Sequence, residues 1–358
     1  MLGRRALLQN SAATAASMAA PGLAAEQQPL LEDIIDPALE IVDPHHHLWD
    51  FPAANGAPAR RYVLDEFLAD AANGHNIVAT VFAECLTSYR TDGPAELKSL
   101  GETEFVTAIA KASAERGGIK VAQGIVGHVD LNIGNRAHGV LEAHMAAAGG
   151  RFRGVRDASA WDEFPFFGRP LDPIRRDLLE SAKFREGFAA LEKLNLSFDA
   201  FCFHTQIDQV TRLAKAFPST KIILDHLGSP LGAGPYAGRK AEVFAAWRKS
   251  IEALAQVPNT FMKVGGLGMR FVAMPSFQAS PPATSEQIAN DWRPFVDVAL
   301  NAFGPARCMF ESNVPPDKDT GSYRTLWNAF KRLAAGYSPS EKARLFSGTA
   351  REVYRLAV

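Results

Sequence analysis

Three consecutive histidines, His45 to His47, are the residues in this chain best suited to chemistry. They follow residues 41–44, which begin with Ile and Val and therefore favour a β-strand. In an extended segment His45 and His47 point to the same side. Neutral imidazole is the commonest protein ligand for metal ions and the usual general base near neutral pH. Because the 358 residues include only nine histidines, this cluster predicts an active site rather than a chance group in a solvated loop.

Other polar residues with chemical potential also follow short apolar runs of high β-propensity. Besides His45 and His47, they are Glu84, Arg156, His204, His226, Lys263, Glu311 and Asn313. When parallel strands form a barrel, residues at their carboxyl ends converge, and that end carries the active site. We therefore expect these side chains to meet. The histidines at positions 75, 138 and 144 fall in turn or helix patterns and are predicted to be surface or packing residues.

Eight apolar, β-type runs alternate with helical patterns, and these runs must position the polar residues. The runs cover residues 41–44, 77–83, 120–126, 152–156, 196–202, 221–224, 260–264 and 307–310. They are continuously apolar, which indicates strands covered on both faces, as in a parallel sheet. Eight strand–helix repeats predict an α/β fold, a single-domain (β/α)8 TIM barrel over residues 40–358 with its active site at the C-terminal ends of the strands. The alternative is an open doubly wound sheet, but no Gly-x-Gly-x-x-Gly or phosphate-binding loop follows any run.

Helical patterns and longer inserts fill the intervals between the strands. The helical stretches include residues 134–148, 173–194 and 338–353. The longer inserts cover residues 50–61, 159–172 and 274–284. These inserts are rich in proline and aromatic residues, so we expect ordered loops over the mouth of the barrel rather than linkers between domains.

The composition is that of an ordinary globular chain. Hydrophobic residues make up 47% and charged residues 22%, with a net charge of −1. Nothing in the charge favours nucleic acid or an anionic membrane as a partner. The expected partner is a small-molecule substrate, and association into a homo-oligomer is left open. Cys85, Cys202 and Cys308 lie far apart in apolar runs without a CxxC motif, so we predict no metal or redox role for them.

Residues 1–25 have the pattern of an export signal rather than of a folded element. Arg4 and Arg5 precede a weakly apolar, Ala-rich run, and the small residues at 22–25 offer a cleavage site. Paired arginines indicate the twin-arginine route, which exports folded proteins. The run is too short and too polar for a permanent membrane anchor. We therefore predict a periplasmic protein with a linker over residues 26–39; the alternative is an uncleaved, disordered N-terminus.

Four segments together resemble the amidohydrolase superfamily. They are Asp43-Pro44-His45-His46-His47-Leu48-Trp49-Asp50, Phe203-His204-Thr205-Gln206, Leu224-Asp225-His226-Leu227-Gly228-Ser229-Pro230 and Phe310-Glu311-Ser312-Asn313-Val314-Pro315. The chain is most similar to the amidohydrolase-2 branch of TIM-barrel hydrolases, which includes sugar lactonases and 2-pyrone-4,6-dicarboxylate hydrolase. The resemblance extends from about residue 40 to the C-terminus. It implies one divalent metal, commonly zinc, although some lactonases of this branch work without metal.

The resemblance assigns His45 and His47 as metal ligands, His204 as both a third ligand and a catalytic residue, and His226 as catalytic. Zinc held by two or three imidazoles keeps a position open for water or substrate, lowers the pKa of bound water and polarises the scissile carbonyl. The superfamily usually has an Asp on the eighth strand, where this chain has Asn313. A carboxamide cannot accept the proton of water, so this departure weakens both the assignment of a base and the prediction of zinc.

A nearby carboxylate must replace the missing Asp if water is to lose a proton. Glu311 lies two positions before Asn313 and faces the same side of a strand, whereas Asp317 lies in the loop just beyond. We prefer Glu311, and we group it with Asn313 as a catalytic residue. The alternative is that Glu311 is a structural carboxylate paired with Lys263 or Arg156.

Cationic and aromatic residues near the strand ends define the expected substrate. A guanidinium or ammonium group there could bind a carboxylate, arginine by a bidentate fork. We assign to substrate binding Arg156, Lys263, Glu84 and Trp49, the last as an apolar wall. The alternative is that the cations pair with neighbouring acids.

These features predict an exported hydrolase that opens a lactone or related ester of a carboxylated small molecule with activated water. A metal-dependent decarboxylase of an aromatic or unsaturated acid is the alternative, because that reaction needs no base at position 313. A third hypothesis is a periplasmic small-molecule-binding barrel without catalysis, although the histidine set of such a protein would be expected to be broken.

Overall fold

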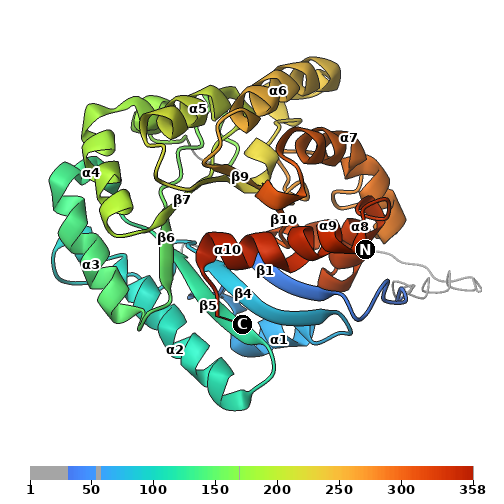
Figure 1. The fold of residues 1–358 in the computed structure, drawn as a ribbon, viewed down its shortest axis with the longest axis horizontal. Helices are drawn as coiled ribbons and strands as arrows, with labels where there is room; N and C mark the ends of the chain where they lie inside the picture. The colour runs from blue at the N-terminus through green and yellow to red at the C-terminus, as the bar shows by residue number, and fades with distance from the viewer. Residues whose placement is uncertain (1–30, 54–57, 169, 358) are drawn as a thin grey trace, which may run out of the picture. The chain divides into compact units, whose positions relative to one another are not determined.

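The computed structural model describes residues 31–53, 58–168 and 170–357. Eight parallel strands form one sheet, and their order in the sheet follows their order in the sequence. They are β1 (Glu40–His46), β4 (Asn76–Ala83), β5 (Lys120–Gly127), β6 (Phe152–Arg156), β7 (Ser197–Ala200), β8 (Ile222–Leu224), β9 (Thr260–Val264) and β10 (Cys308–Phe310). Figure 1 shows the strands inside a ring of helices, which confirms the predicted (β/α)8 barrel.

The two edges of the sheet meet where β1 leads into the histidines. The His47 N–H donates to the Val314 carbonyl at 2.8 Å, and the Asn313 N–H donates to the His45 carbonyl at 3.0 Å. These bonds join the segment after β10 to the end of β1, so the barrel is nearly closed. They also bring residues 311–313 beside the histidine cluster.

Helices cover the outside of the barrel. They are α1 (Leu64–Ala71), α2 (Leu100–Arg116), α3 (Ala137–Ala147), α4 (Ala182–Lys193), α5 (Ile207–Ala216), α6 (Lys240–Ala255), α7 (Ser285–Phe303), α8 (Tyr323–Leu333), α9 (Pro339–Ala343) and α10 (Thr349–Tyr354). The sequence sets their limits through caps. For example, Thr284 and Gln287 form a reciprocal capping box at the start of α7, and Gly304, with φ of 75°, follows its last residue.

Three helical stretches are less regular than predicted. Residues 173–194 form two helices, because Ser181 is extended and its hydroxyl accepts the Phe184 N–H at the start of α4. The α3 helix begins only at Ala137, after an irregular turn in which Gly134 has a positive φ. The C-terminal stretch is divided between α9 and α10 by a π-helical turn, Arg344–Gly348.

The insert at residues 50–61, predicted as an ordered loop, contributes to a short strand pair that the sequence did not predict. Within its described residues, β2 (Trp49–Phe51) pairs antiparallel with β3 (Arg60–Tyr62). Three-residue strands are too short to show periodicity in a sequence, which is why the pattern did not reveal them. The hairpin places Trp49 immediately beyond the histidine cluster.

The interior of the barrel near the strand starts is filled by apolar side chains and covered by α10. Side chains from β1, β4, β5, β8, β9 and β10 pack there with Val353 and Tyr354 of α10. Lys221, just before β8, donates to the Glu352 carbonyl at 3.2 Å, which places α10 at the starting ends of the strands. Figure 1 shows α10 lying across the ring. The opposite end, where the strands finish, is left for the polar residues.

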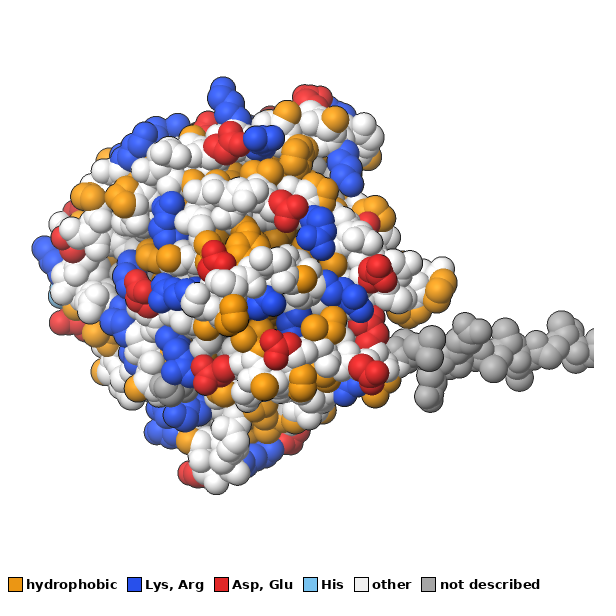
Figure 2. All heavy atoms as spheres, turned by 45° about the vertical axis from the view of Figure 1, so that its right-hand side comes forward, with side chains coloured by type: hydrophobic (Ala, Val, Ile, Leu, Met, Phe, Trp, Pro, Cys, Tyr) orange, Lys and Arg blue, Asp and Glu red, His pale blue; other side chains and the backbone are white. Residues whose placement is uncertain are grey.

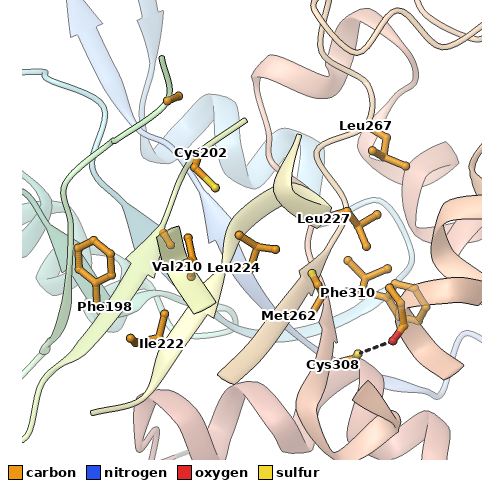
Figure 3. Close-up of a cluster of buried hydrophobic side chains, with 14 of the residues drawn as sticks. Phe198, Cys202, Val210, Ile222, Leu224, Leu227, Met262, Leu267, Cys308 and Phe310 are labelled. Atoms are coloured by element: carbon orange, nitrogen blue, oxygen red, sulfur yellow. Dashed lines mark hydrogen bonds between the residues drawn. The ribbon is translucent and has the colours of Figure 1, made fainter. Parts of the chain in front are cut away.

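A second apolar layer lies between the strands and the outer helices. Figure 3 shows part of it, with Phe198, Leu224, Met262 and Phe310 from four different strands. Two of the three cysteines, at positions 202 and 308, are buried in this layer, whereas the cysteine at position 85 is only partly buried; all three are free thiols. Cys202 and Cys308 are therefore packing residues of the core.

The predicted signal, residues 1–25, lies outside the described residues. Part of the predicted linker contacts α8, since the Ile35 N–H donates to Asn328 Oδ1 at 3.0 Å and Asn328 Nδ2 donates to the Asp33 carbonyl at 2.8 Å. Among the described helices, none combines the length and apolar character that crossing a membrane requires. Figure 2 shows acidic and basic side chains interspersed over one face of the molecule.

Candidate active site

His45 and His47 lie at the carboxyl end of β1 and are buried. His46, between them, points to the opposite side of the strand, as the alternation of side chains requires. Its Nε2 is 2.7 Å from Thr80 Oγ1, and its ring stacks on Phe67 with centroids 4.4 Å apart. Burial lowers the pKa of His46 to about 3. The middle histidine is therefore a neutral packing residue, and the outer two face the barrel.

The Nε2 atoms of His45 and His47 face each other at 3.3 Å. His47 Nδ1 lies 2.8 Å from the Ala83 carbonyl oxygen. A carbonyl can only accept, so Nδ1 carries the proton and Nε2 keeps a free lone pair. Burial, with the charges of His45 and Arg156, lowers the pKa of His47 well below its ordinary value and keeps it neutral. Two nitrogens bound at ~2.0–2.1 Å to one tetrahedral ion are roughly 3.3 Å apart, so this pair fits a divalent metal.

Glu311, just after β10, lies between His226 and His45. Its Oε1 is 2.7 Å from His226 Nδ1 and accepts the His226 N–H at 3.1 Å, while Oε2 is 2.9 Å from His45 Nδ1. Burial alone would raise the pKa of Glu311, but the two imidazoles hold it at about 2. Because both oxygens face imidazole nitrogens, the geometry suits orientation of these rings better than removal of a proton from water.

Two glycines after β9 provide the space for this arrangement. A Cβ on Gly266 would lie 2.3 Å from His226 Nδ1, and a Cβ on Gly265 would lie 2.3 Å from the Glu311 carbonyl oxygen. Gly266 also has φ of 67°, and His226 itself has φ of 56°. A side chain at either glycine would therefore displace the His226–Glu311 pair.

Arg156, the last residue of β6, is buried and paired with carboxylates. Its Nε donates to Glu84 Oε1 at 2.9 Å, and Nη2 donates to the Glu84 carbonyl. Its Nη1 lies 3.4 Å from Asp225 Oδ2 and 3.3 Å from His45 Nε2. Burial opposes the charge of Arg156, but the neighbouring Glu84 and Asp225 raise its pKa, so the guanidinium stays cationic.

Lys263 on β9 is fully buried inside the barrel. Its Nζ lies 2.5 Å from Asp199 Oδ2, 3.1 Å from Asp225 Oδ1 and 3.1 Å from His45 Nδ1. The Tyr354 hydroxyl of α10 donates to the same Asp199 oxygen at 2.7 Å. Burial alone would lower the pKa of Lys263, but the surrounding carboxylates raise it above its ordinary value.

The expected substrate-binding set is therefore divided. Arg156 and Lys263 pair with buried acids, Glu84 among them, which is the alternative that the sequence left open. Neither cation is therefore free for a substrate carboxylate. Trp49 is different, because it is partly exposed and its ring stacks near His47 with centroids 6.2 Å apart. Trp49 remains a candidate wall of the substrate site.

His204, after β7, lies apart from the histidine pair. Its Nδ1 accepts the Leu231 N–H at 3.3 Å, and its ring meets Tyr236 edge-on at 5.4 Å. In the neutral ring the proton must then be on Nε2, which cannot bind a metal in that form. Burial lowers the pKa of His204 to about 4. Within the described ranges no hydrogen bond or ring contact joins His204 to His45 or His47, so the arrangement favours a neutral hydrogen-bond donor over a third metal ligand.

Asn313, with φ of 47°, holds a second carboxylate at the end of the barrel. Its Nδ2 donates to Asp317 Oδ1 at 2.8 Å, and the Gly268 N–H donates to Asp317 Oδ2 at 3.3 Å. Burial raises the pKa of Asp317 to about 7, although the charge of His226 and the bond from Asn313 oppose the rise. A carboxylate with a pKa near neutral pH is suited to general base catalysis, so Asp317 is a candidate base beside Glu311.

Asp225 is a site residue that the sequence reasoning did not assign. It lies fully buried beside His45 and Arg156, and with His45 and His226 it forms a group whose candidate ligand atoms lie within 4.8 Å of one another. Its position directly after β8 and directly before His226 was the available signal. An adjacent pair of residues points to different sides in a regular strand, and this pair converges only because His226 takes a left-handed conformation.

The chain belongs to the amidohydrolase family, whose pattern matches residues 42–356. It is 33% identical over 337 residues to an uncharacterized protein, y4mH, of Sinorhizobium fredii, covering 89% of this chain and 99% of that protein. It is 26% identical over 324 residues to an L-fucono-1,5-lactonase of Burkholderia multivorans, covering 88% and 96%. A zinc-bound amidohydrolase structure from Burkholderia multivorans shares the fold, with a TM-score of 0.66 at 24% identity over 88% of this chain and 99% of that one. Members of this family are enzymes, so the buried polar cluster is a candidate active site.

Proposed function

We propose that this chain hydrolyses a lactone or a closely related ester by attack of water on the carbonyl carbon. The observation that carries the proposal is the combination of the neutral His45–His47 pair with a buried carboxylate, Asp317, whose pKa is near 7. Similarity to L-fucono-1,5-lactonases supports a lactone in particular.

Asp317 acts as the general base in this proposal. It takes one proton from water as the water oxygen bonds to the carbonyl carbon, and the ring carbon–oxygen bond then breaks. The leaving oxygen takes the proton back from Asp317, so the products are one hydroxy acid and an unchanged enzyme. His204, with its proton on Nε2, donates a hydrogen bond to a substrate oxygen.

The metal belongs to the same proposal. His45 and His47 would hold a divalent ion, for which we propose zinc, through their facing Nε2 atoms. Bound there, the ion supplies polarisation of the carbonyl. Glu311 holds the ring of His45 from its Nδ1 side, whereas Arg156 Nη1 lies 3.3 Å from its Nε2 and would have to release this contact for an ion to bind.

The contacts alter the expected substrate class. A carboxylated substrate was predicted because Arg156 and Lys263 follow strands, but both cations already have buried carboxylate partners. We therefore propose an uncharged lactone, such as that of a sugar acid, whose hydroxyl groups meet neutral donors and the aromatic Trp49. The proposed substrate is therefore still a lactone, but one without the carboxylate group that the sequence led us to expect.

The experiment is a panel of lactones, L-fucono-1,5-lactone included, with acid release and carbon dioxide measured together. Acid release without carbon dioxide supports the proposal. Carbon dioxide from an aromatic acid supports the decarboxylase instead. Saturable binding without turnover supports a binding barrel. Asp317→Asn serves as the matched control, because it keeps the shape of the side chain and removes the base.

A further inference from the structure

The deep half of the polar cluster already contains a cation. His45, Asp225 and His226 form the group of described residues that could hold a metal ion. Lys263 Nζ lies 3.1 Å from Nδ1 of His45 and 3.1 Å from Oδ1 of Asp225. Two members of the group therefore present their atoms to an ammonium group.

An ammonium and a divalent ion cannot share these atoms. A metal bound by His45 Nδ1 and an oxygen of Asp225 would lie about 2 Å from each. Lys263 Nζ occupies the space between the same two atoms, and its positive charge would repel the ion. The Nε2 atoms of His45 and His47 face away from Lys263, on the other edge of the His45 ring.

We propose that Lys263 is the resident cation of this deep half, in the position that His45, Asp225 and His226 would otherwise offer to a divalent ion. Lys263 thereby excludes an ion from Nδ1 of His45 and from Asp225, so the wild type binds no second ion at these atoms. The inference goes beyond the proposed lactonase activity and does not rest on it, since metal content is measured without a substrate.

The surroundings of Lys263 support this role. Three buried carboxylates contact the two cations Arg156 and Lys263; they are Glu84, Asp199 and Asp225. Buried acids need positive partners, because an unpaired charge in the interior is strongly unfavourable. The ammonium group of Lys263 thus supplies the positive charge that a bound metal ion supplies in other clusters of carboxylates.

The test is to remove the ammonium and ask whether a metal takes its place. Lys263→Met keeps most of the side-chain volume, leaves Asp199 without its cation and leaves Asp225 with Arg156 alone. We expect the variant to have a Tm lower than that of the wild type by several degrees in chelator. We expect added Mn²⁺ or Zn²⁺ to recover most of that loss and to raise the metal content by about one ion per chain over the wild type, measured by mass spectrometry of the dialysed protein.

Lys331→Met is the matched control. Lys331 is also a buried lysine beside an imidazole, with Nζ 2.9 Å from His75 Nδ1 and 2.8 Å from the Asp36 carbonyl, but it lies on α8 away from the acids. Its loss should lower the Tm without creating a metal site, so added ions should not recover it.

If Lys263→Met does not fold, the double variant Asp199→Asn with Lys263→Gln removes one negative charge with the positive one and is measured in the same way. The proposal is overturned if neither variant gains an ion, if the control gains one equally, or if the wild type binds two. None of these results depends on turnover of a lactone, so a failure here is separate from a failure of the proposed function.

Discussion

At the scale of single residues, the two candidate bases, Glu311 and Asp317, differ in the groups that contact them. Glu311 faces two imidazoles, whereas Asp317 is fixed by Asn313 and by the Gly268 N–H and has a pKa near 7. In the sequence, Asn313 stands where the superfamily has a catalytic Asp, although a carboxamide cannot act as a base. In the structure it positions the carboxylate that can be one.

Asp317→Asn should lower kcat by roughly 10²–10⁴-fold, the usual contribution of a general base. The base works deprotonated, so the kcat of the wild type should rise with pH and level off above about 7. The measurement is kcat against pH for both proteins, with the Tm as a control for folding. A variant that keeps wild-type kcat would show that another group is the base.

His204→Ala should leave the metal content unchanged and lower kcat, because its Nδ1 accepts a backbone N–H and its Nε2 carries the proton. His47→Ala should lower the metal content, since its Nε2 is the free lone pair that faces His45. Metal-to-protein ratios of the two variants decide between these roles. Equal metal loss in both would restore His204 as a ligand.

At the scale of elements, the residue at which each strand ends determines where its polar side chain lies. His226 can meet Glu311 only because β8 ends in left-handed residues and because Gly265 and Gly266 leave a space beside it. Backbone conformations and spaces of this kind produce no apolar pattern in the sequence. They become visible only when the positions of neighbouring segments are known.

Gly266→Ala should lower kcat by roughly 100-fold, because its Cβ would displace His226, and small displacements of reacting groups have effects of that size. Gly238→Ala is the control, since Gly238 also has a positive φ but has no atom within 4 Å of the added Cβ. Both should lose on the order of 1–2 kcal/mol of stability from backbone strain. Equal kcat in the two variants would contradict the packing argument.

The elements were largely predictable and the pairings were not. The apolar runs located all eight strands, and β6 and β9 have the predicted limits. Strand ends also located His45, His47, His226 and Glu311. Whether Arg156 and Lys263 were free depended on Asp225 and Asp199, which come from other strands, and such contacts have no local signal in a sequence. The same reason explains why the sequence could not show that both oxygens of Glu311 face imidazoles.

At the scale of the whole molecule, export remains a proposal that rests on residues 1–25. Arg4 and Arg5 should be needed for it, because the twin-arginine route reads the paired arginines. Changing both to lysine should keep the enzyme in the cytoplasm with its activity unchanged. Fractionation of cells that express the two forms, with an antibody to the barrel, makes the comparison. Equal periplasmic amounts of both forms would refute this route.

The closure of the barrel on β1 also has a consequence for synthesis. The Val314 and Asn313 contacts that pair with His45 and His47 come from the far end of the chain. Ribosomes add roughly 5–20 residues per second, so β1 leaves the ribosome many seconds before its final partner exists. During that interval one sheet edge and three histidines remain open to other chains. A fragment that stops before β10 lacks these partners and Glu311, so it cannot assemble the site.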